Sequence, residues 1–351
     1  HWGGGTPTFI SRDQMAQLMD HTRRHFQLAD DDVGEYSIEI DPREADAGSV
    51  GLLRRLGFNR MSLGVQDFDP AVQKAVNRIQ TEKETLEVLE AARAEGFRSI
   101  SIDLIYGLPF QTVDGFRRTL ERIVEFEPDR LSVFNYAHLP ARFKPQRRIE
   151  EGDLPVPQTK LDILKSTGEL LADAGYVYIG MDHFALPDDE LTIAQREGGL
   201  QRNFQGYSTR RECDLVGLGV SSIGRVGDCY AQNIKDIQTW QATVAEGKLP
   251  IWRGVSLSTE DRLRRRVIES IMCHGELQFQ AVEAMFAIDF PEHFARELRN
   301  LEQMEADGLL EMSGDAILVT PSGRLLLRNI AMVFDEYLQM QEDTPRFSRV
   351  I

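Results

Sequence analysis

The sequence has 351 residues, of which 42% are hydrophobic and 27% are charged, which is typical of a globular protein with one large domain or one large and one small domain. The formal net charge is −16, and this acidic balance argues against a general nucleic-acid-binding or anionic-membrane surface. No apolar stretch approaches the roughly 20 residues of a membrane helix.

The chain opens with a glycine turn, because residues 1–7 read HWGGGTP. Such a turn exposes bare backbone N–H and C=O groups and therefore suits close contact with a small polar ligand. A domain rarely opens at its ligand loop, so we expect an N-terminal piece to precede His1.

The first two-thirds of the sequence alternates β-rich segments with amphipathic helices. Two of the helices open with capping-box patterns, Ser11 with Gln14 and Thr81 with Glu84. In chain order the predicted elements are a helix from 11 to 26, a strand at 36–40, a helix at 50–57, a strand at 60–65, a helix at 81–96, a strand at 99–106, a helix at 116–124, a strand at 131–136, a helix at 161–174, a strand at 177–181 and a glycine-broken strand at 215–220.

Repeated β-α units imply parallel strands, arranged either in an open doubly wound sheet or in a full or partial barrel. Polar residues recur at the strand ends: Glu39, Gln66, Asp103, Asn135 and Asp182. In a β/α barrel such ends share one mouth, whereas an open sheet spreads them along an edge. This clustering favours an α/β fold with a partial TIM-like (β/α) barrel.

The last third has a different pattern. Residues 238–255 are predicted to be a connector with a short helix, and Ser258 with Asp261 begins the next helix. A second helix at 293–306 and a strand-turn-strand at 309–319 follow, an order typical of a winged-helix module. The acidity of the chain favours a packing role over DNA binding. We therefore predict a barrel core at 1–237, a connector at 238–255 and an α-rich winged-helix-like module at 256–351.

Residues 1–7 resemble the glycine motif of radical S-adenosylmethionine (SAM) enzymes. Further segments, in the same order, resemble the oxygen-independent coproporphyrinogen III oxidases, also called coproporphyrinogen dehydrogenases. These segments are IEIDPRE at 38–44, SLGVQDF at 62–68, DLIYGLP at 103–109, SVFNYAHLP at 132–140, GMDHFA at 180–185, RNFQGY at 202–207 and RFSRVI at 346–351. The resemblance covers nearly the whole chain and implies a barrel of the radical SAM type.

The resemblance implies an oxidoreductase of haem and porphyrin biosynthesis. A 5′-deoxyadenosyl radical from SAM would drive oxidative decarboxylation of two propionates of coproporphyrinogen III to vinyl groups, giving protoporphyrinogen IX. The implied cofactors are two molecules of SAM and a [4Fe-4S] cluster in the full-length protein. The expected partners are coproporphyrinogen III and an electron-donor protein, with no nucleic acid and no membrane, and we expect a monomer in the cytoplasm.

The resemblance assigns one set of residues to a first SAM molecule. Gly4 and Gly5 suit its ammonium group, because side chains there would block its approach to backbone carbonyls. Glu39, at a strand end, can accept hydrogen bonds from ribose hydroxyls or pair with a cationic group. Ala137 and Ile223 match family positions around the adenine.

A second set of residues is carried over for a second SAM molecule: Gly5, Thr6, Gln66, Arg78 and Asp103. Arg78 can meet a carboxylate bidentately, and Asp103 can take an ammonium or a ribose hydroxyl. Gln66 offers both a donor and an acceptor. A helix-surface ion pair for Arg78 and a strand cap for Asp103 are the purely structural alternatives. The resemblance assigns no catalytic residue.

The substrate carries four propionates, so cationic partners are expected, and Arg202 is our candidate. His138 and His183 follow strands and could tune a proton or a hydrogen bond, or simply pack.

One departure from the family concerns the cluster, which the family holds with a C-x3-C-x2-C motif upstream of the glycine motif. Cys213, Cys229 and Cys273 are far apart, do not match that spacing and read as free thiols of a reducing compartment. The expected metal-binding cysteines therefore lie upstream of His1, and we expect the sequence as given not to catalyse the reaction alone.

Two alternatives stay open at this point. One is a haem-binding chaperone of the same superfamily, which carries a His-Asn-x-x-Tyr-Trp motif. The matching segment here is RNFQGY at 202–207, without the His and the Trp, and this favours the oxidase. The other alternative is a catalytically dead SAM- or tetrapyrrole-binding domain.

Overall fold

The computed structural model describes residues 1–30, 32–210 and 213–339. These residues form two compact units, of which the first ends at Thr192 and the second begins at Ile193. This division by packing differs from the boundary at residue 237 expected from the sequence, and the domain limits stay a prediction. The closing motif at 346–351 lies outside the described residues.

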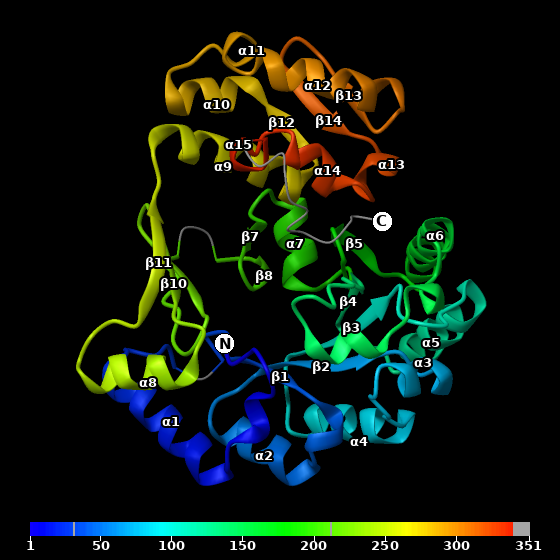
Figure 1. The fold of residues 1–351 in the computed structure, drawn as a ribbon, viewed down its shortest axis with the longest axis vertical. Coiled ribbons are helices and arrows are strands. Elements are labelled where there is room, and N and C mark those ends of the chain that lie inside the picture. Colours follow the sequence, from blue (N-terminus) through cyan, green and yellow to red (C-terminus); the bar gives the residue numbers. More distant parts are fainter. Residues whose placement is uncertain (31, 211–212, 340–351) are drawn as a thin grey trace. The chain divides into compact units, whose positions relative to one another are not determined.

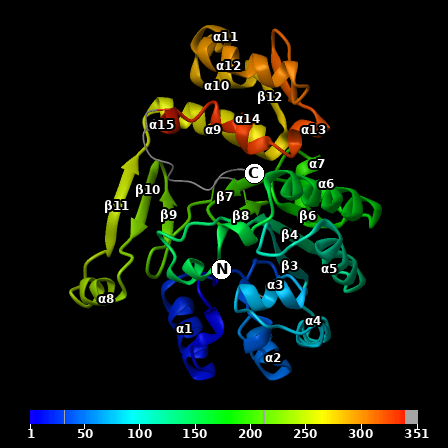
Figure 2. The ribbon, with the colours of Figure 1, turned by 45° about the vertical axis from the view of Figure 1, so that its right-hand side comes forward.

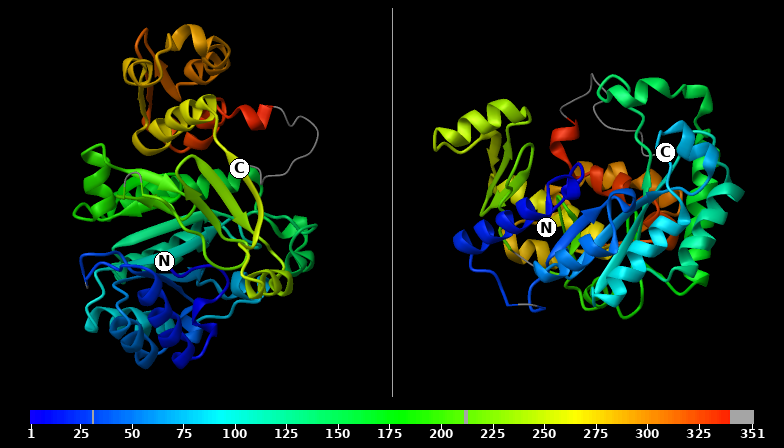
Figure 3. Two further views of the ribbon diagram at one scale, coloured as in Figure 1. Left: turned by 90° about the vertical axis from the view of Figure 1, so that its left-hand side faces the viewer. Right: turned by 90° about the horizontal axis from the view of Figure 1, so that it is seen from below.

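The first unit contains a six-stranded sheet with the strand order β1-β2-β3-β4-β6-β5 (Figure 1). Its strands are β1 (Ser37–Ile40), β2 (Arg60–Gln66), β3 (Ser99–Tyr106), β4 (Arg130–Asn135), β5 (Val177–Gly180) and β6 (His183–Ala185). β1 to β4 are parallel and run side by side in Figure 3. The predicted α/β alternation is therefore confirmed for these strands.

β6 is absent from the predicted elements. It pairs antiparallel with both β4 and β5. Met181, with φ of 51°, lies in the tight reversal between β5 and β6. A strand of three residues directly after a turn carries too little periodicity to be recognised in the sequence.

Helices alternate with the strands of the first unit, and several of them lie along one side of the parallel sheet (Figure 1). They are α1 (Arg12–His25), α2 (Ala47–Arg55), α3 (Pro70–Ala75), α4 (Glu82–Ala94), α5 (Val113–Glu125), α6 (Pro157–Asp173) and α7 (Glu190–Arg196), which continues past Thr192, with short 3-10 helices η1 (Pro7–Phe9), η2 (Pro42–Glu44), η3 (Lys144–Arg148) and η4 (Glu151–Asp153). The capping boxes predicted at Ser11 and Thr81 are both present. No helix among the described residues is long and apolar enough to cross a bilayer.

The core of the first unit lies between the sheet and these helices. Alternate strand residues such as Ile38, Leu63, Ile102 and Leu131 are completely buried. The outermost strands of the sheet among the described residues are β1, whose edge carries only an isolated bridge to Trp2, and β5. Its curvature into a partial barrel stays a prediction.

The second unit opens with a hairpin of β7 (Gln201–Asn203) and β8 (Gly206–Ser208). An antiparallel sheet of β9 (Ile223–Val226), β10 (Cys229–Asn233) and β11 (Ile251–Ser256) follows, with helix α8 (Ile237–Ala245) between β10 and β11 (Figure 2). Residues 238–255, expected to be a connector, thus hold most of α8 and of β11.

The strand predicted at 215–220 is wrong. Only Leu215 pairs there, in an isolated bridge with Arg225. Gly217 packs against the backbone of Ile223, where a Cβ would lie 2.9 Å from the carbonyl carbon. Gly219 then takes a φ of 94°, which ends any extended run.

The rest of the second unit is α-rich (Figure 2). Its elements are α9 (Thr259–His274), β12 (Glu276–Gln278), α10 (Phe279–Phe286), α11 (Phe290–His293), α12 (Ala295–Ala306), β13 (Leu310–Met312), β14 (Ala316–Val319), α13 (Pro321–Arg324), α14 (Leu327–Met332) and α15 (Glu336–Gln339). The two predicted helices and the strand-turn-strand are confirmed as α9, α12 and the β13–β14 hairpin. β12 pairs with β14 as a third strand.

Candidate active site on the polar face of the sheet

The parallel strands present polar residues on the face opposite the buried alternate residues. Glu39 pairs with Ser62, and Gly64 pairs with Asp103, which in turn pairs with Ser132. Because side chains alternate along a strand and paired residues share a face, these residues lie on one side of the sheet. We call this side, defined by Glu39, Ser62, Gly64, Asp103 and Ser132, the polar face.

The glycine turn is attached to the edge of this face. Trp2 bridges to Ile38 in parallel, with its N–H 2.9 Å from the Ser37 carbonyl oxygen. The Gly4 N–H donates to Glu39 Oε2 at 2.9 Å, and His1 Nε2 lies 3.4 Å from Glu39 Oε1. The hydrogen bonds from His1 and from the Gly4 backbone hold the pKa of Glu39 below its usual value, against the opposing effect of burial. Glu39 is therefore a carboxylate anchored at the turn.

The glycines of the turn are required by its geometry. Gly4 and Gly5 have φ of 81° and 65°, and a Cβ on either would meet no atom within 4 Å. A Cβ on Gly3 would lie 2.7 Å from Glu39 Oε1. The turn thus keeps exposed backbone beside an anchored carboxylate, as a small polar ligand with a cationic group requires.

Asp103 occupies the middle of the polar face. It accepts a hydrogen bond from Ser62 Oγ at 2.7 Å. Burial raises its pKa to about 6, opposed by hydrogen bonds to Ser62 and Ser132 and helped by the neighbouring charge of Glu39. A carboxyl group whose pKa is raised in a partly enclosed polar setting is a candidate for a functional site.

Gln66 and Arg78 meet above Gly64. Arg78 Nη2 donates to the Gly64 carbonyl at 2.6 Å, and Arg78 Nη1 lies 3.0 Å from Asp41 Oδ2. A Cβ on Gly64 would lie 3.0 Å from Gln66 Nε2 and 3.3 Å from Arg78 Nη2. A glycine at this position leaves room for both side chains over β2.

Both side chains also carry buried atoms without a hydrogen-bond partner. Among the described residues, Gln66 Oε1 and Arg78 Nε are buried and have no hydrogen-bond partner. Gln66 has a φ of 71° at a break in the β2–β3 register, a strained conformation for a non-glycine residue. Unpaired buried polar atoms and local strain together indicate a ligand site.

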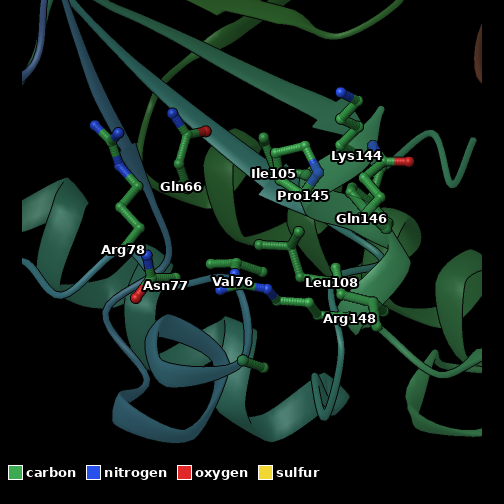
Figure 4. Close-up of a pocket in the computed structure, with 13 residues that line it drawn as sticks. Gln66, Val76, Asn77, Arg78, Ile105, Leu108, Lys144, Pro145, Gln146 and Arg148 are labelled. Atoms are coloured by element: carbon green, nitrogen blue, oxygen red, sulfur yellow. The ribbon is translucent and has the colours of Figure 1, made fainter. Parts of the chain in front are cut away.

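A cavity of about 600 Å³ opens beside these two residues (Figure 4). Arg78, Lys144 and Arg148 supply cationic groups, and Gln66, Asn77 and Gln146 supply amides. Its apolar lining includes Val76, Ile105 and Leu108. No carboxylate from the described part of the chain lines the cavity, so it suits an anionic group attached to an apolar body.

The remaining predicted residues lie in three places. Thr6 follows the glycine turn and precedes η1. Ala137 follows β4, and its carbonyl accepts a hydrogen bond at 3.0 Å from Gln146 Nε2, whose side chain lines the cavity. Ile223 is the first residue of β9 in the second unit, and its part in the site stays a prediction.

The cysteines do not form a metal site. Cys213 and Cys229 are exposed, whereas Cys273 is buried and burial raises the pKa of its thiol to about 12. The described residues contain no group of three or more His, Cys, Asp or Glu side chains placed to hold a metal ion.

Several residues of the site were not predicted. Ser62 and Ser132 lie within the family motifs, but no local pattern indicates that both hydrogen-bond Asp103. Asp41, which holds Arg78, directly follows β1 and could have been suspected from its position at a strand end. Lys144 and Arg148 belong to a basic run at 142–148, and this run is the sequence feature that could have indicated them.

Two family models match the chain. The model of the radical SAM superfamily matches residues 1–123, and that of the HemN C-terminal domain matches residues 257–326. Among curated proteins, the oxygen-independent coproporphyrinogen III oxidase of Pseudomonas aeruginosa is 58% identical over 351 residues, covering 100% of this chain and 76% of that protein. The protein of that name from Escherichia coli K12 is 50% identical over the same coverage.

A solved structure is similar over most of the chain. It is coproporphyrinogen III oxidase (HemN) from Escherichia coli, described as a radical SAM enzyme. The similarity has a TM-score of 0.93 with 51% sequence identity, covering 96% of this chain and 77% of that one.

Proposed function

Because this chain belongs to the oxygen-independent coproporphyrinogen III oxidases of the radical SAM superfamily, we propose that it acts in haem biosynthesis on coproporphyrinogen III. Two propionate side chains would each lose CO2, a hydrogen atom from the β-carbon and one further electron, and become vinyl groups. The product is protoporphyrinogen IX. The observation that carries the proposal is that Glu39, hydrogen-bonded to an exposed glycine turn, shares one face of the sheet with Asp103, while Gln66 and Arg78 lie over Gly64 of that face.

The residues on the polar face fit SAM. The glycine turn offers backbone groups to its ammonium, with Glu39 fixed beside them, and Asp103 offers a carboxylate in the middle of the face. Arg78 and Gln66 offer a guanidinium and an amide with unsatisfied buried atoms, suited to a carboxylate and a hydroxyl. When bound, SAM supplies the radical that removes hydrogen from the substrate.

Two SAM molecules are part of the proposal. Gly4, Gly5 and Glu39 would hold the first, with Ala137 and Ile223 at its adenine. Gly5, Thr6, Gln66, Arg78 and Asp103 would hold the second. The cavity beside Gln66 and Arg78 supports the second site, because its cations match a SAM carboxylate.

The described residues do not fit a [4Fe-4S] cluster, because no cysteine or histidine group among them is placed for one. The cluster therefore stays a prediction for the full-length protein. We also propose a monomer that works in the cytoplasm with an electron-donor protein and without nucleic acid or membrane. Three widely separated cysteines and the net charge of −16 support that setting.

The test is vinyl formation in the full-length protein after anaerobic iron–sulfur reconstitution, supplied with SAM, a reductant and coproporphyrinogen III. Protoporphyrinogen should accumulate, and Arg78→Ala should reduce its rate at least about tenfold with cluster content unchanged, because a charge-assisted contact is lost. Arg55→Ala, which changes an exposed arginine of α2, is the matched control and should behave as the wild type. A wild-type protein with an intact cluster and no vinyl product would overturn the proposed function.

A further inference from the structure

Helix α9 carries a one-sided stripe of charge. Arg262, Arg265, Arg266 and Glu269 follow the spacing i, i+3, i+4, i+7, so they share one face of the helix. Leu263, Val267, Ser270 and Ile271 are buried on another face. The stripe is thus held in place by a helix whose opposite side packs into the core of the second unit.

Two cavities of the second unit lie along this stripe. The first, of about 440 Å³, is lined by Arg225, Arg262, Arg265 and Arg266 against one carboxylate, Glu269. The second, of about 520 Å³, shares Gln201, Arg225, Arg265 and Glu269 with the first and adds Arg202, Arg210 and Asp335. In a chain with a net charge of −16, this concentration of arginines needs an explanation.

Neighbouring protein groups do not fully satisfy these arginines. The guanidinium group of Arg266 has no hydrogen-bond or ion-pair partner among the described residues, although the residue is only partly exposed; its backbone carbonyl accepts from Ser270 Oγ at 3.0 Å. Nε of Arg202, Nε of Arg262 and Nη1 of Arg265 are buried without a hydrogen-bond partner there. The Arg265–Glu269 contact is long, at 3.7 Å. Such groups have free capacity for an external anion.

Other contacts are present and limit this capacity. Arg262 Nη1 pairs with Asp228 Oδ2 at 3.0 Å, and Arg225 Nη2 donates to the Cys213 carbonyl at 2.8 Å. These bonds fix the two guanidinium groups in place. A fixed guanidinium loses less conformational entropy when it binds a carboxylate.

Apolar side chains complete the walls. Phe204, 58% exposed, packs edge-on against Tyr230 with ring centroids 5.4 Å apart, and both line the second cavity. The hairpin that carries Phe204 is attached to α9 by a 2.8 Å hydrogen bond from Tyr207 Oη to the Met272 carbonyl. Met285 and Phe286 line the first cavity. Arginines beside apolar and aromatic walls match a large ring system that carries carboxylate arms.

We propose that this arginine-lined pair of cavities binds carboxylate arms of the tetrapyrrole substrate, with Arg266 and Arg265 as specificity-determining residues. The inference rests on the proposed function and deepens it by assigning propionate recognition to the second unit. It extends the expectation for Arg202, whose guanidinium lies 5.6 Å from the Tyr207 ring.

The experiment measures binding without turnover. Coproporphyrin III, the stable oxidised relative with four carboxylates, is titrated into the full-length protein without SAM and followed by fluorescence. Arg266→Gln and Arg265→Gln should each weaken its binding about tenfold. In the same two variants, the affinity for mesoporphyrin IX, which has two carboxylates, should fall less than about threefold relative to the wild type. SAM affinity, measured by calorimetry, should stay unchanged in both variants.

Arg299→Gln is the matched control, because it removes an equal charge from an exposed arginine of α12 that lines neither cavity. Equal coproporphyrin affinity in the wild type and in Arg266→Gln would refute the inference and leave the proposed function intact. Displacement of coproporphyrin by millimolar inorganic phosphate would indicate a small-anion site and also refute it. A wild-type protein that forms vinyl product but binds no coproporphyrin III would also refute the inference, whereas an intact cluster with no vinyl product from coproporphyrinogen III would refute the proposed function itself.

Discussion

Glu39 links the glycine turn to the sheet through both its side chain and its backbone. Its Oε2 accepts from the Gly4 N–H at 2.9 Å, and its own N–H donates to the Trp2 carbonyl at the same distance. Truncation of this side chain would release the Gly4 N–H and remove a carboxylate from the polar face, while the backbone bridge at Trp2 would stay. Glu39→Ala should weaken SAM binding at least about tenfold, because a hydrogen bond to a charged group contributes about 1.5–3 kcal/mol.

Isothermal titration calorimetry on the cluster-loaded protein checks this prediction. Glu39→Gln, which keeps an acceptor for Gly4, should lose less affinity than Glu39→Ala. Glu44→Ala removes an exposed carboxylate shortly after β1 and should leave SAM affinity unchanged. Wild-type affinity in Glu39→Ala would contradict the assigned role.

Asp103 makes the stability of the protein depend on pH. Its pKa is raised from 3.8 to about 6 in the folded chain. The folded state therefore keeps a proton that the unfolded chain has lost between about pH 4 and pH 6, and the free energy of unfolding falls as pH rises through this window. The contribution of Asp103 to the free energy of unfolding is fully present below about pH 4 and is lost above about pH 6. This rise in the pKa of Asp103 corresponds to a change of about 3 kcal/mol in the free energy of unfolding.

Urea unfolding between about pH 4 and pH 7 tests this assignment. Asp103→Asn should reduce the fall in unfolding free energy by about 3 kcal/mol, because the amide does not titrate. Asp188→Asn changes an exposed aspartate after β6 and should leave the fall unchanged. If the wild type and Asp103→Asn show the same pH profile, the pKa of Asp103 is not raised.

At the scale of elements, the joint between the β13–β14 hairpin and α13 depends on one glycine. A Cβ on Gly323 would lie 1.8 Å from the Leu309 carbonyl oxygen, and Gly323 is buried. Backbone on the opposite side cannot move as a flexible side chain does. Gly323→Ala should therefore destabilise the protein by about 3 kcal/mol, at the upper end for overpacking.

Gly314, in the turn between β13 and β14, offers the control. A Cβ there would meet no atom within 4 Å, and its φ is not in the positive range. Gly314→Ala should change the free energy of unfolding by less than about 1 kcal/mol. Equal stability of the two variants in urea would show that α13 is free to move away from Leu309.

At the scale of the whole molecule, the net charge opposes binding to polyanions. The chain carries a net charge of −16, and six of its arginines line two cavities of the second unit. A helical module with a three-stranded sheet is therefore not sufficient reason to expect DNA binding. In a gel-shift assay at about 150 mM salt, a duplex of about 30 base pairs should show no complex up to about 10 μM protein. A complex in the low micromolar range would contradict this prediction.

Local patterns predicted much of the fold. The capping boxes at Ser11, Thr81 and Ser258 all form, because each depends on residues three positions apart. The parallel strands β1 to β4 follow from β-rich runs separated by amphipathic helices. The strands β6 to β11 were missed, because three-residue strands such as β6 and a fully exposed strand such as β11 have weak periodicity.

The amino-acid sequence by itself determined the order of helices and strands and the motifs that carry the family resemblance, since both are properties of neighbouring residues. Only the tertiary structure placed Arg78 and Gln66 over Gly64, put Asp103 on the same sheet face as Glu39, and showed which face of α9 borders cavities. Those features depend on strand register and on packing between segments far apart in the chain, and no local pattern records either.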